Sequence, residues 1–205
     1  DLDKKDKDHR SSRHLVLLAK NEIGYKNLLA LQKFSWSEEN FYYRPRVNFE
    51  MLKKHHRGLV ALTACLKGLV AEEVLNDKPK RAQNTLKRLK QIFGDDLYLE
   101  IQLHNIFSDE NDIQRIYNLA LIKFSKELDI KTVITNDTHY TDKGMHIVQS
   151  KVIKMKVDTD LSHAYCKSIW LKSYDELKKT WQEDCSYIPE DVFNRSVDAT
   201  IEISD

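Results

Sequence analysis

The most regular pattern of apolar and polar positions in the chain runs from Leu97 to Leu103. Every second residue of this segment is aliphatic, and Tyr98, Glu100 and Gln102 stand between the aliphatic positions. A period of two is that of a β-strand, because successive side chains of a strand point to opposite faces. The pattern therefore predicts a strand over Leu97–Leu103, and His104 continues its polar face.

Shorter apolar or β-branched runs predict three further strands. One lies within Ser11–Lys20, the next is Leu59–Thr63, and the last is Lys131–Thr135. Runs of about four to eight such residues, bounded by turn-forming residues, are typical of buried strands.

Apolar residues at helical spacing predict helices between and beyond these strands. Several of these helices have clear end signals, namely Asn48 and Ser173 as N-caps, Pro79 and Pro189 as opening prolines, and Gly94 as a stop. The predicted helices cover residues 23–34, 48–56, 68–75, 79–93, 109–128, 142–155, 173–181 and 189–201.

The order of these elements indicates the fold class. Strands that alternate with helices of about ten or more residues predict parallel βα units, so the class is α/β. The pattern does not distinguish an open, doubly wound sheet from a barrel. In the first helix, Leu28, Leu29 and Leu31 are expected to face the core.

Composition and charge narrow the class of protein. The 205 residues include 33 Lys and Arg against 32 Asp and Glu, so the net charge is +1. This balance excludes a strongly basic protein that coats nucleic acid, and net charge alone indicates no partner. No apolar stretch approaches the ~20 residues of a membrane span, and the three cysteines are irregularly spaced. We expect a cytoplasmic protein with reduced thiols and no membrane partner.

Residues suited to catalysis or metal binding follow three of the predicted strands. Cys65 follows the second strand, His104 ends the alternating strand, and Asp137 and His139 follow the last one. The carboxyl ends of parallel strands open on one edge, so these side chains are expected at a common rim. Asp137 and His139 stand two apart in an extended segment and can share a divalent ion. Glycine-rich phosphate loops, a G-x-S-x-G elbow and a C-x-x-C pair do not occur.

Each candidate also has a structural interpretation, which spacing alone leaves open. Asp137 can cap the next helix while His139 bonds locally, and Cys65 can be a small buried residue. Glu100 and His104 face the same way and can line a site or satisfy each other. The remaining histidines and cysteines considered are expected at a solvated helix end, in the core or on the surface: His55, His56, His163, Cys166 and Cys185.

An ordered set of short segments is more specific than any of these spacings. The set reads HLVLLAKN from His14, GYKNL from Gly24, FYYRPR from Phe41, GLVALTACLKG from Gly58, FGDDLYLEIQ from Phe93, TNDTHY from Thr135, YDEL from Tyr174 and IPE from Ile188. In this order the segments resemble the PHP (polymerase and histidinol phosphatase) domain of bacterial DNA polymerase III alpha subunits. The resemblance covers nearly the whole chain from His14 onward.

This resemblance implies a fold and a site. The fold would be a distorted seven-stranded βα barrel of PHP type, with a trinuclear metal site. The positions that match the ligands are His14, Cys65, Asp137 and His139. The implied cofactors are Zn²⁺ or Mn²⁺ at this site, and Mg²⁺ for the polymerase as a whole. His14 is the least expected ligand, because it lies at the start of a predicted strand rather than at its carboxyl end.

The chain also departs from the family pattern. The motif H-x-H-S-x-Y-S, which opens that pattern, does not occur in the chain, so several expected ligands and the first strands are missing. Ala64 stands where the family usually has glycine, and Leu69 where an acidic residue is common. We therefore expect residues 1–13 to be a charged lead-in and residues 14–205 to be the C-terminal two-thirds of a PHP domain. These residues alone are expected to be inactive.

The function implied by the resemblance is that of part of a replicative DNA polymerase III alpha subunit. Its PHP domain would either act as a metal-dependent phosphoesterase or 3′–5′ exonuclease, or serve as a structural brace for the polymerase. The implied partners are DNA, through the polymerase, and replisome subunits such as the proofreading subunit and the sliding clamp.

Two alternative functions stay open. A stand-alone PHP phosphatase acting on a small phosphate ester would have no polymerase palm encoded downstream. The other alternative is a metal-free interaction module. In that case, replacing His139 by alanine would change neither the metal content nor the stability of the protein.

Overall fold

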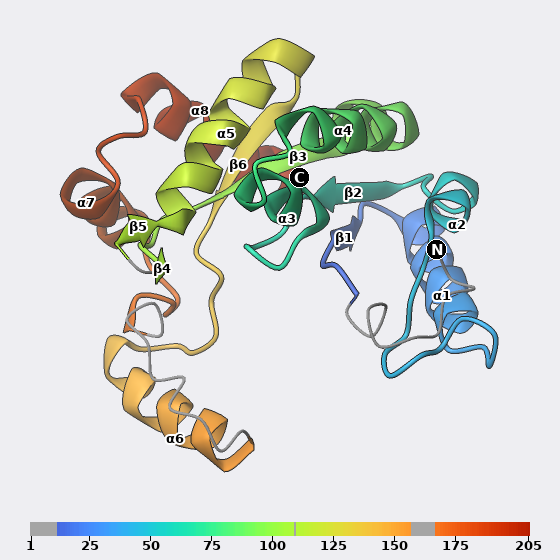
Figure 1. Ribbon diagram of the computed structural model, residues 1–205, viewed down its shortest axis with the longest axis horizontal. Helices are drawn as coiled ribbons and strands as arrows, with labels where there is room; N and C mark the ends of the chain where they lie inside the picture. Colours follow the sequence, from blue (N-terminus) through green and yellow to red (C-terminus); the bar gives the residue numbers. More distant parts are fainter. Residues whose placement is uncertain (1–11, 109, 157–166) are drawn as a thin grey trace. The chain divides into compact units, whose positions relative to one another are not determined.

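A computed structural model describes residues 12–108, 110–156 and 167–205 (Figure 1). The chain forms two compact units, Asp1–Leu99 and Glu100–Asp205, which we call the N-terminal and C-terminal units. Most of the expected lead-in, together with His163 and Cys166, lies outside the described residues.

The N-terminal unit is built on strands β1 (Val16–Ala19) and β2 (Leu59–Leu62) and on the beginning of β3 (Leu97–Gln102). β1 and β2 are antiparallel, with Val16 opposite Leu62, whereas β2 and β3 are parallel. All four residues of β2 are buried. The helices of this unit are α1 (Glu22–Ser35), α2 (Phe49–Lys54), α3 (Leu69–Leu75) and α4 (Pro79–Phe93), and the turn η2 (Gly94–Asp96) leads into β3.

Local capping interactions fix where these helices begin and end. The Asn21 side chain accepts a hydrogen bond from the backbone N–H of Gly24 and starts α1, and Asn48 caps α2 in the same way. Pro79 opens α4, and Gly94, with a φ of 58°, ends it. A left-handed φ favours glycine because it has no Cβ, so α4 stops there.

The C-terminal unit contains the rest of β3, strand β6 (Lys131–Thr135) and the short hairpin of β4 (Phe107–Ser108) and β5 (Asn111–Asp112). Its core lies where β3 and β6 meet α5 and the C-terminal helix, and includes Ile101, Ile134 and Phe193. The helices and the turn of this unit are α5 (Ile113–Leu128), η3 (Lys143–Met145), α6 (His146–Lys156), α7 (Tyr174–Asp184) and α8 (Glu190–Ser204).

The α/β class is confirmed. The strands form one four-stranded sheet with the order β1-β2-β3-β6 and one two-stranded sheet. A seven-stranded barrel is not formed by the strands of the described residues, so that part of the fold stays a prediction. The expectation of parallel neighbours is wrong for β1 and β2. Two helices, α1 and α2, lie between these strands in place of a single crossover helix, and the chain returns in the opposite direction.

Most predicted elements begin and end within a few residues of the observed ones. For α4 and β6 the predicted and observed bounds are identical. The helix predicted from residue 109 instead begins at Ile113, because the hairpin β4–β5 comes first and the Asp112 carboxylate caps the helix by accepting from the Arg115 N–H. α6 begins after η3 rather than at residue 142. No helix in the described part of the chain is long and apolar enough to cross a bilayer.

One predicted core residue is wrong. Leu29 is 46% exposed, whereas Leu31 is 4% exposed. The buried face of α1 is formed by Gly24, Leu31 and Ser35. Leu29 comes five positions after Gly24. This spacing turns its side chain about 140° around the helix axis from Gly24, so Leu29 lies away from the buried face.

Candidate metal-binding residues

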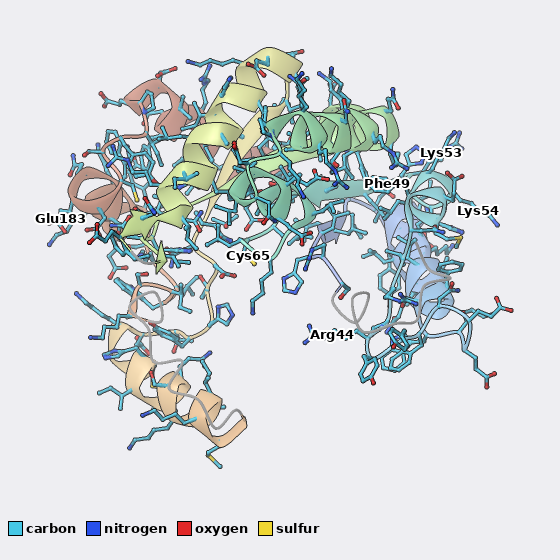
Figure 2. All side chains as sticks on the ribbon, in the orientation of Figure 1. Arg44, Phe49, Lys53, Lys54, Cys65 and Glu183 are labelled. Carbon is cyan, nitrogen blue, oxygen red and sulfur yellow. The ribbon has the colours of Figure 1, made fainter. Side chains whose placement is uncertain are left out.

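His14 and Cys65 lie side by side in the N-terminal unit although 51 residues separate them. His14 stands just before β1, where its backbone N–H donates to the carbonyl of Lys67. Cys65 follows β2 and is labelled in Figure 2. Because β1 runs antiparallel to β2, the beginning of β1 meets the carboxyl end of β2. The antiparallel pairing therefore explains how a histidine at the start of a strand comes to the rim.

The separation of the two donor atoms suits a bound metal. The Cys65 Sγ is 3.7 Å from the His14 Nδ1. With Zn–S bonds of about 2.3 Å and Zn–N bonds of about 2.0 Å, tetrahedral geometry places sulfur and nitrogen about 3.5 Å apart. Zinc also binds thiolate and imidazole ligands more readily than magnesium does, because magnesium prefers oxygen ligands. The donor pair therefore fits a zinc-like ion.

A tight turn holds Cys65 in place. Ala64 has a φ of 62° and is 2% exposed, so it adopts the left-handed conformation at the position where the resemblance expects glycine. The Gly68 N–H donates to the Cys65 carbonyl at 2.7 Å. A Cβ at Gly68 would lie 2.5 Å from the Thr63 carbonyl oxygen, so the turn has no room for a side chain there.

Asp137 and His139 form the corresponding pair in the C-terminal unit. They follow β6, and Asp137 has a φ of 45°. The His139 Nδ1 is 2.6 Å from the Asp137 carbonyl oxygen and 4.0 Å from its carboxylate. The local hydrogen bond of His139 considered above is present. Asp137 does not cap the next helix, because the turn η3 begins at Lys143, directly after Asp142.

This hydrogen bond determines which nitrogen of His139 can bind a metal. A carbonyl oxygen only accepts, so the Nδ1 of His139 must donate and therefore carries the proton. The lone pair available to a metal is then on Nε2. Metal-binding histidines usually donate their other ring N–H to a carbonyl or carboxylate in this way. The pair thus fits metal binding as well.

Lys172 and Asn136 hold the loop that carries this pair, and Lys172 was not among the predicted site residues. The Lys172 ammonium donates to the Asn136 side-chain oxygen at 2.9 Å and to the Ser168 carbonyl at 2.8 Å. The Asn136 amide donates to the carbonyls of Ser168 and Trp170. Partial burial lowers the pKa of Lys172 to about 8. No spacing rule links residues 36 apart, so the sequence offered no signal for this contact.

Glu100 and His104 are both buried, with exposed fractions of 5% and 1%. The Glu100 carboxylate accepts from the Thr135 hydroxyl at 2.7 Å and from the Gln102 amide at 2.9 Å. The contact with Thr135 ties β3 to β6, whereas Gln102 lies on β3 itself. Cys185, by contrast, is a core thiol, and burial raises its pKa to about 12.

The buried His104 gives a prediction about stability. Burial, assisted by the positive charge of Lys172, lowers the pKa of His104 from 6.5 to about 4. Between these values the unfolded chain binds a proton that the folded chain does not, so stability falls as the pH falls. From pH 7 to pH 5 this group should remove about 2 kcal/mol of the free energy of unfolding. Urea unfolding of the wild type and of His104→Asn should show a shallower pH dependence in the variant, and equal slopes would contradict the prediction.

Each pair supplies two donor groups. Among the described residues, no group of three or more His, Cys, Asp or Glu side chains is placed to hold a metal ion. His14 and Cys65 form one pair in the N-terminal unit, and Asp137 and His139 form another in the C-terminal unit.

Comparison with known proteins identifies the family. The family model of the PHP domain matches residues 1–104. The chain belongs to the PHP domain family. His14 and Cys65 lie inside the matched residues, and Asp137 and His139 follow them.

Curated relatives of this PHP domain chain are DNA polymerase III alpha subunits. The subunit from Aquifex aeolicus is 41% identical over 152 residues, which cover 73% of this chain and 13% of the relative. The subunit from Borreliella burgdorferi is 36% identical over 181 residues, 86% of this chain and 15% of the relative. The subunit from Helicobacter pylori (strain 26695) is 33% identical over 199 residues, which cover 88% of this chain and 15% of the relative. The chain therefore spans about one-seventh of the length of these relatives.

Proposed function

We propose that the chain is part of a replicative DNA polymerase III alpha subunit, and that His14, Cys65, Asp137 and His139 are metal ligands of its PHP domain. The relatives whose alignments cover most of the chain are DNA polymerase III alpha subunits, which supports the proposed parent protein. The observation that carries the second part is the 3.7 Å approach of the Cys65 sulfur to the His14 nitrogen. The proposed ions are Zn²⁺ or Mn²⁺, and the proposed fold of the intact domain is the seven-stranded barrel.

The proposed reaction is hydrolysis of a phosphodiester, with a 3′–5′ exonuclease as its specific form. A divalent ion at such a site supplies Lewis-acid activation of the phosphodiester and of a water molecule. The chain itself supplies the thiol and imidazole donors, held by the turn from Thr63 to Gly68. It also holds the proton of His139 on Nδ1, which donates a hydrogen bond to the Asp137 carbonyl and leaves Nε2 free of a proton.

The proposed partners follow from the proposed parent protein. DNA would be reached through the polymerase, and the proofreading subunit and the sliding clamp are proposed replisome partners. The relatives' shared name supports a role in DNA synthesis and does not distinguish among these subunits.

Cobalt binding tests the proposed ligands directly. We expect Cys65→Ser and His139→Ala each to weaken Co²⁺ or Zn²⁺ binding at least tenfold, because a lost ligand costs no less than a lost supporting contact. Thiolate-to-cobalt absorption should appear in the wild type and vanish in Cys65→Ser. Cys185 should not contribute to this absorption, since burial keeps it protonated.

His146→Ala is the matched control for His139→Ala. The His146 Nδ1 is 2.8 Å from the Lys143 carbonyl, so this histidine makes the same kind of local hydrogen bond. The control should bind metal like the wild type. Undiminished metal binding by both Cys65→Ser and His139→Ala would contradict the proposed ligands.

Assays on the intact polypeptide separate hydrolysis from the alternatives. Release of nucleotides from the 3′ end of a labelled DNA strand, lost in Asp137→Asn, would support the exonuclease. Hydrolysis of p-nitrophenyl phosphate without action on DNA would indicate a small-ester phosphatase. A protein that hydrolyses neither substrate, but is less stable with Asp137→Asn, would have a PHP domain that braces the polymerase.

A further inference from the structure

Charge is divided unequally between the two units. Residues 1–99 carry 20 Lys and Arg against 13 Asp and Glu, whereas residues 100–205 carry 13 against 19. The net charge of +1 conceals this asymmetry. An uneven distribution of this kind is a known indication of contact with a polyanion.

Helix α4 concentrates the positive charge of the N-terminal unit. Its residues Pro79–Phe93 include five cationic side chains and no acidic one. Four other helices each contain an ion pair between residues one turn apart, such as Lys26 with Glu22 in α1 and Arg195 with Asp191 in α8. An ordinary solvated helix mixes both signs of charge, so α4 is an exception.

Four of the five cations of α4 form one exposed row. Lys80, Arg81, Lys87 and Arg88 are exposed and recur at a seven-residue interval, with Asn84 exposed between them. The opposite face is buried and consists of Ala82, Thr85, Leu86, Leu89 and Phe93. Within the described residues, no ion pair joins Lys80, Arg81 or Lys87 to a carboxylate. Asp77 and Asp95, which are also exposed, lie just beyond the two ends of the helix.

Helix α2 extends this row. The Arg88 guanidinium lies over the Phe49 ring, 3.9 Å from its centroid, and so joins the two helices. Lys53 is four residues after Phe49 on α2, and both Lys53 and Lys54 are exposed and project outward (Figure 2). Glu50 is the acidic residue of α2. We call Lys53, Lys54, Lys80, Arg81, Lys87 and Arg88 the basic face.

The beginning of α4 is unfavourable for the isolated protein. Lys80 and Arg81 lie in the first turn, where the helix dipole is positive, and Lys78 makes no side-chain cap hydrogen bond. Cations at this position destabilise a helix, whereas an anion would stabilise it. A phosphate group bound there would relieve this local disadvantage.

We propose that the basic face binds the sugar–phosphate backbone of nucleic acid without reading its sequence. The inference deepens the proposed function, because it assigns a face of this chain to the DNA of the proposed polymerase. A membrane is a poorer match, since the apolar side of α4 is buried within the unit. An acidic protein partner fits the basic face less well than nucleic acid does, because none of the large exposed hydrophobic residues belongs to α2 or α4. Protein interfaces normally need such apolar anchors.

Salt-dependent binding to a short labelled DNA duplex tests this proposal. The test variant is Lys80→Gln with Arg81→Gln and Lys87→Gln, which keeps Arg88 on Phe49. Each lost phosphate contact should reduce the slope of log K against log salt by about 0.9, so the expected reduction is about 2.7, with affinity at least tenfold lower at low salt. A single strand of the same length should show a smaller reduction, about 0.7 for each contact.

The control variant is Lys123→Gln with Lys178→Gln and Lys179→Gln. These exposed lysines lie in the acidic C-terminal unit, and the control loses the same three charges. It should bind like the wild type. Equal binding by the test variant and the wild type would overturn the proposal, and so would competition by polyglutamate as strong as that by DNA. Cobalt binding by the test variant should be unchanged, so failure here is distinguishable from failure of the proposed metal ligands.

Discussion

Replacing Gly24 by alanine is expected to unfold the N-terminal unit or to lower its free energy of unfolding by about 4 kcal/mol. A Cβ at Gly24 would lie 1.9 Å from the Gly58 carbonyl oxygen and 2.7 Å from the carbonyl carbon. Both neighbours are backbone atoms at the entrance to β2, and Gly58 accepts a hydrogen bond from Lys20, so neither can move freely. Urea unfolding monitored by circular dichroism measures the loss.

Gly144→Ala is the matched control for this change. A Cβ at Gly144 meets no atom within 4 Å. The same substitution should therefore change stability by no more than about 0.5 kcal/mol. Similar stabilities for Gly24→Ala and the wild type would show that α1 and the Gly58 backbone are not packed as the structure describes.

Replacing Phe193 by alanine should cost about 3–5 kcal/mol in the C-terminal unit, because a large buried ring leaves a cavity. Phe193 is fully buried in α8, and its ring stacks on Trp181 at a centroid distance of 4.5 Å. The indole N–H of Trp181 donates to the Ile188 carbonyl, so loss of the stack also loosens the connection between α7 and α8. Urea unfolding followed by tryptophan fluorescence reports both effects.

Phe107→Ala separates the loss of a buried ring from the loss of any ring. Phe107 is 60% exposed, and its replacement should change the free energy of unfolding by less than about 0.5 kcal/mol. If the two phenylalanine variants were equally stable, the core built around α8 and β6 would not have the packing described above.

The proposed metal site and the basic face are distinct features of the chain. Cys65 is held by a turn after β2, whereas the basic face is carried by the outer sides of α2 and α4. Metal binding and salt-dependent DNA binding should therefore respond to different substitutions. A protein that keeps one property while losing the other would show directly which proposal fails.

Local signals made several elements predictable from the sequence. Pro79 and Gly94 mark the ends of α4, and Ser173 forms a capping box with Glu176 at the start of α7. These interactions join residues at most four apart, so they are present in the sequence as spacings. The alternation in β3 predicted a strand correctly, yet all six of its residues are buried, on both faces.

The candidate site was only partly predictable. Cys65, Asp137 and His139 were indicated because each follows a predicted strand, and His14 was indicated only by resemblance to the PHP family. Lys172 gave no signal, because its role depends on contacts with Asn136 and Ser168. The hairpin before α5 was missed because two-residue strands are too short to show a period.

The amino-acid sequence by itself determined the α/β class, the main helices and strands, and the residue types that can bind a metal. Periodicity, caps and turn residues act over a few positions, so they can be read along the chain. Only the tertiary structure decided that β1 runs antiparallel to β2, which brings His14 to Cys65, and that Leu31 rather than Leu29 is buried. These outcomes depend on hydrogen bonds and packing between residues far apart in the chain, whose pairing no local spacing specifies.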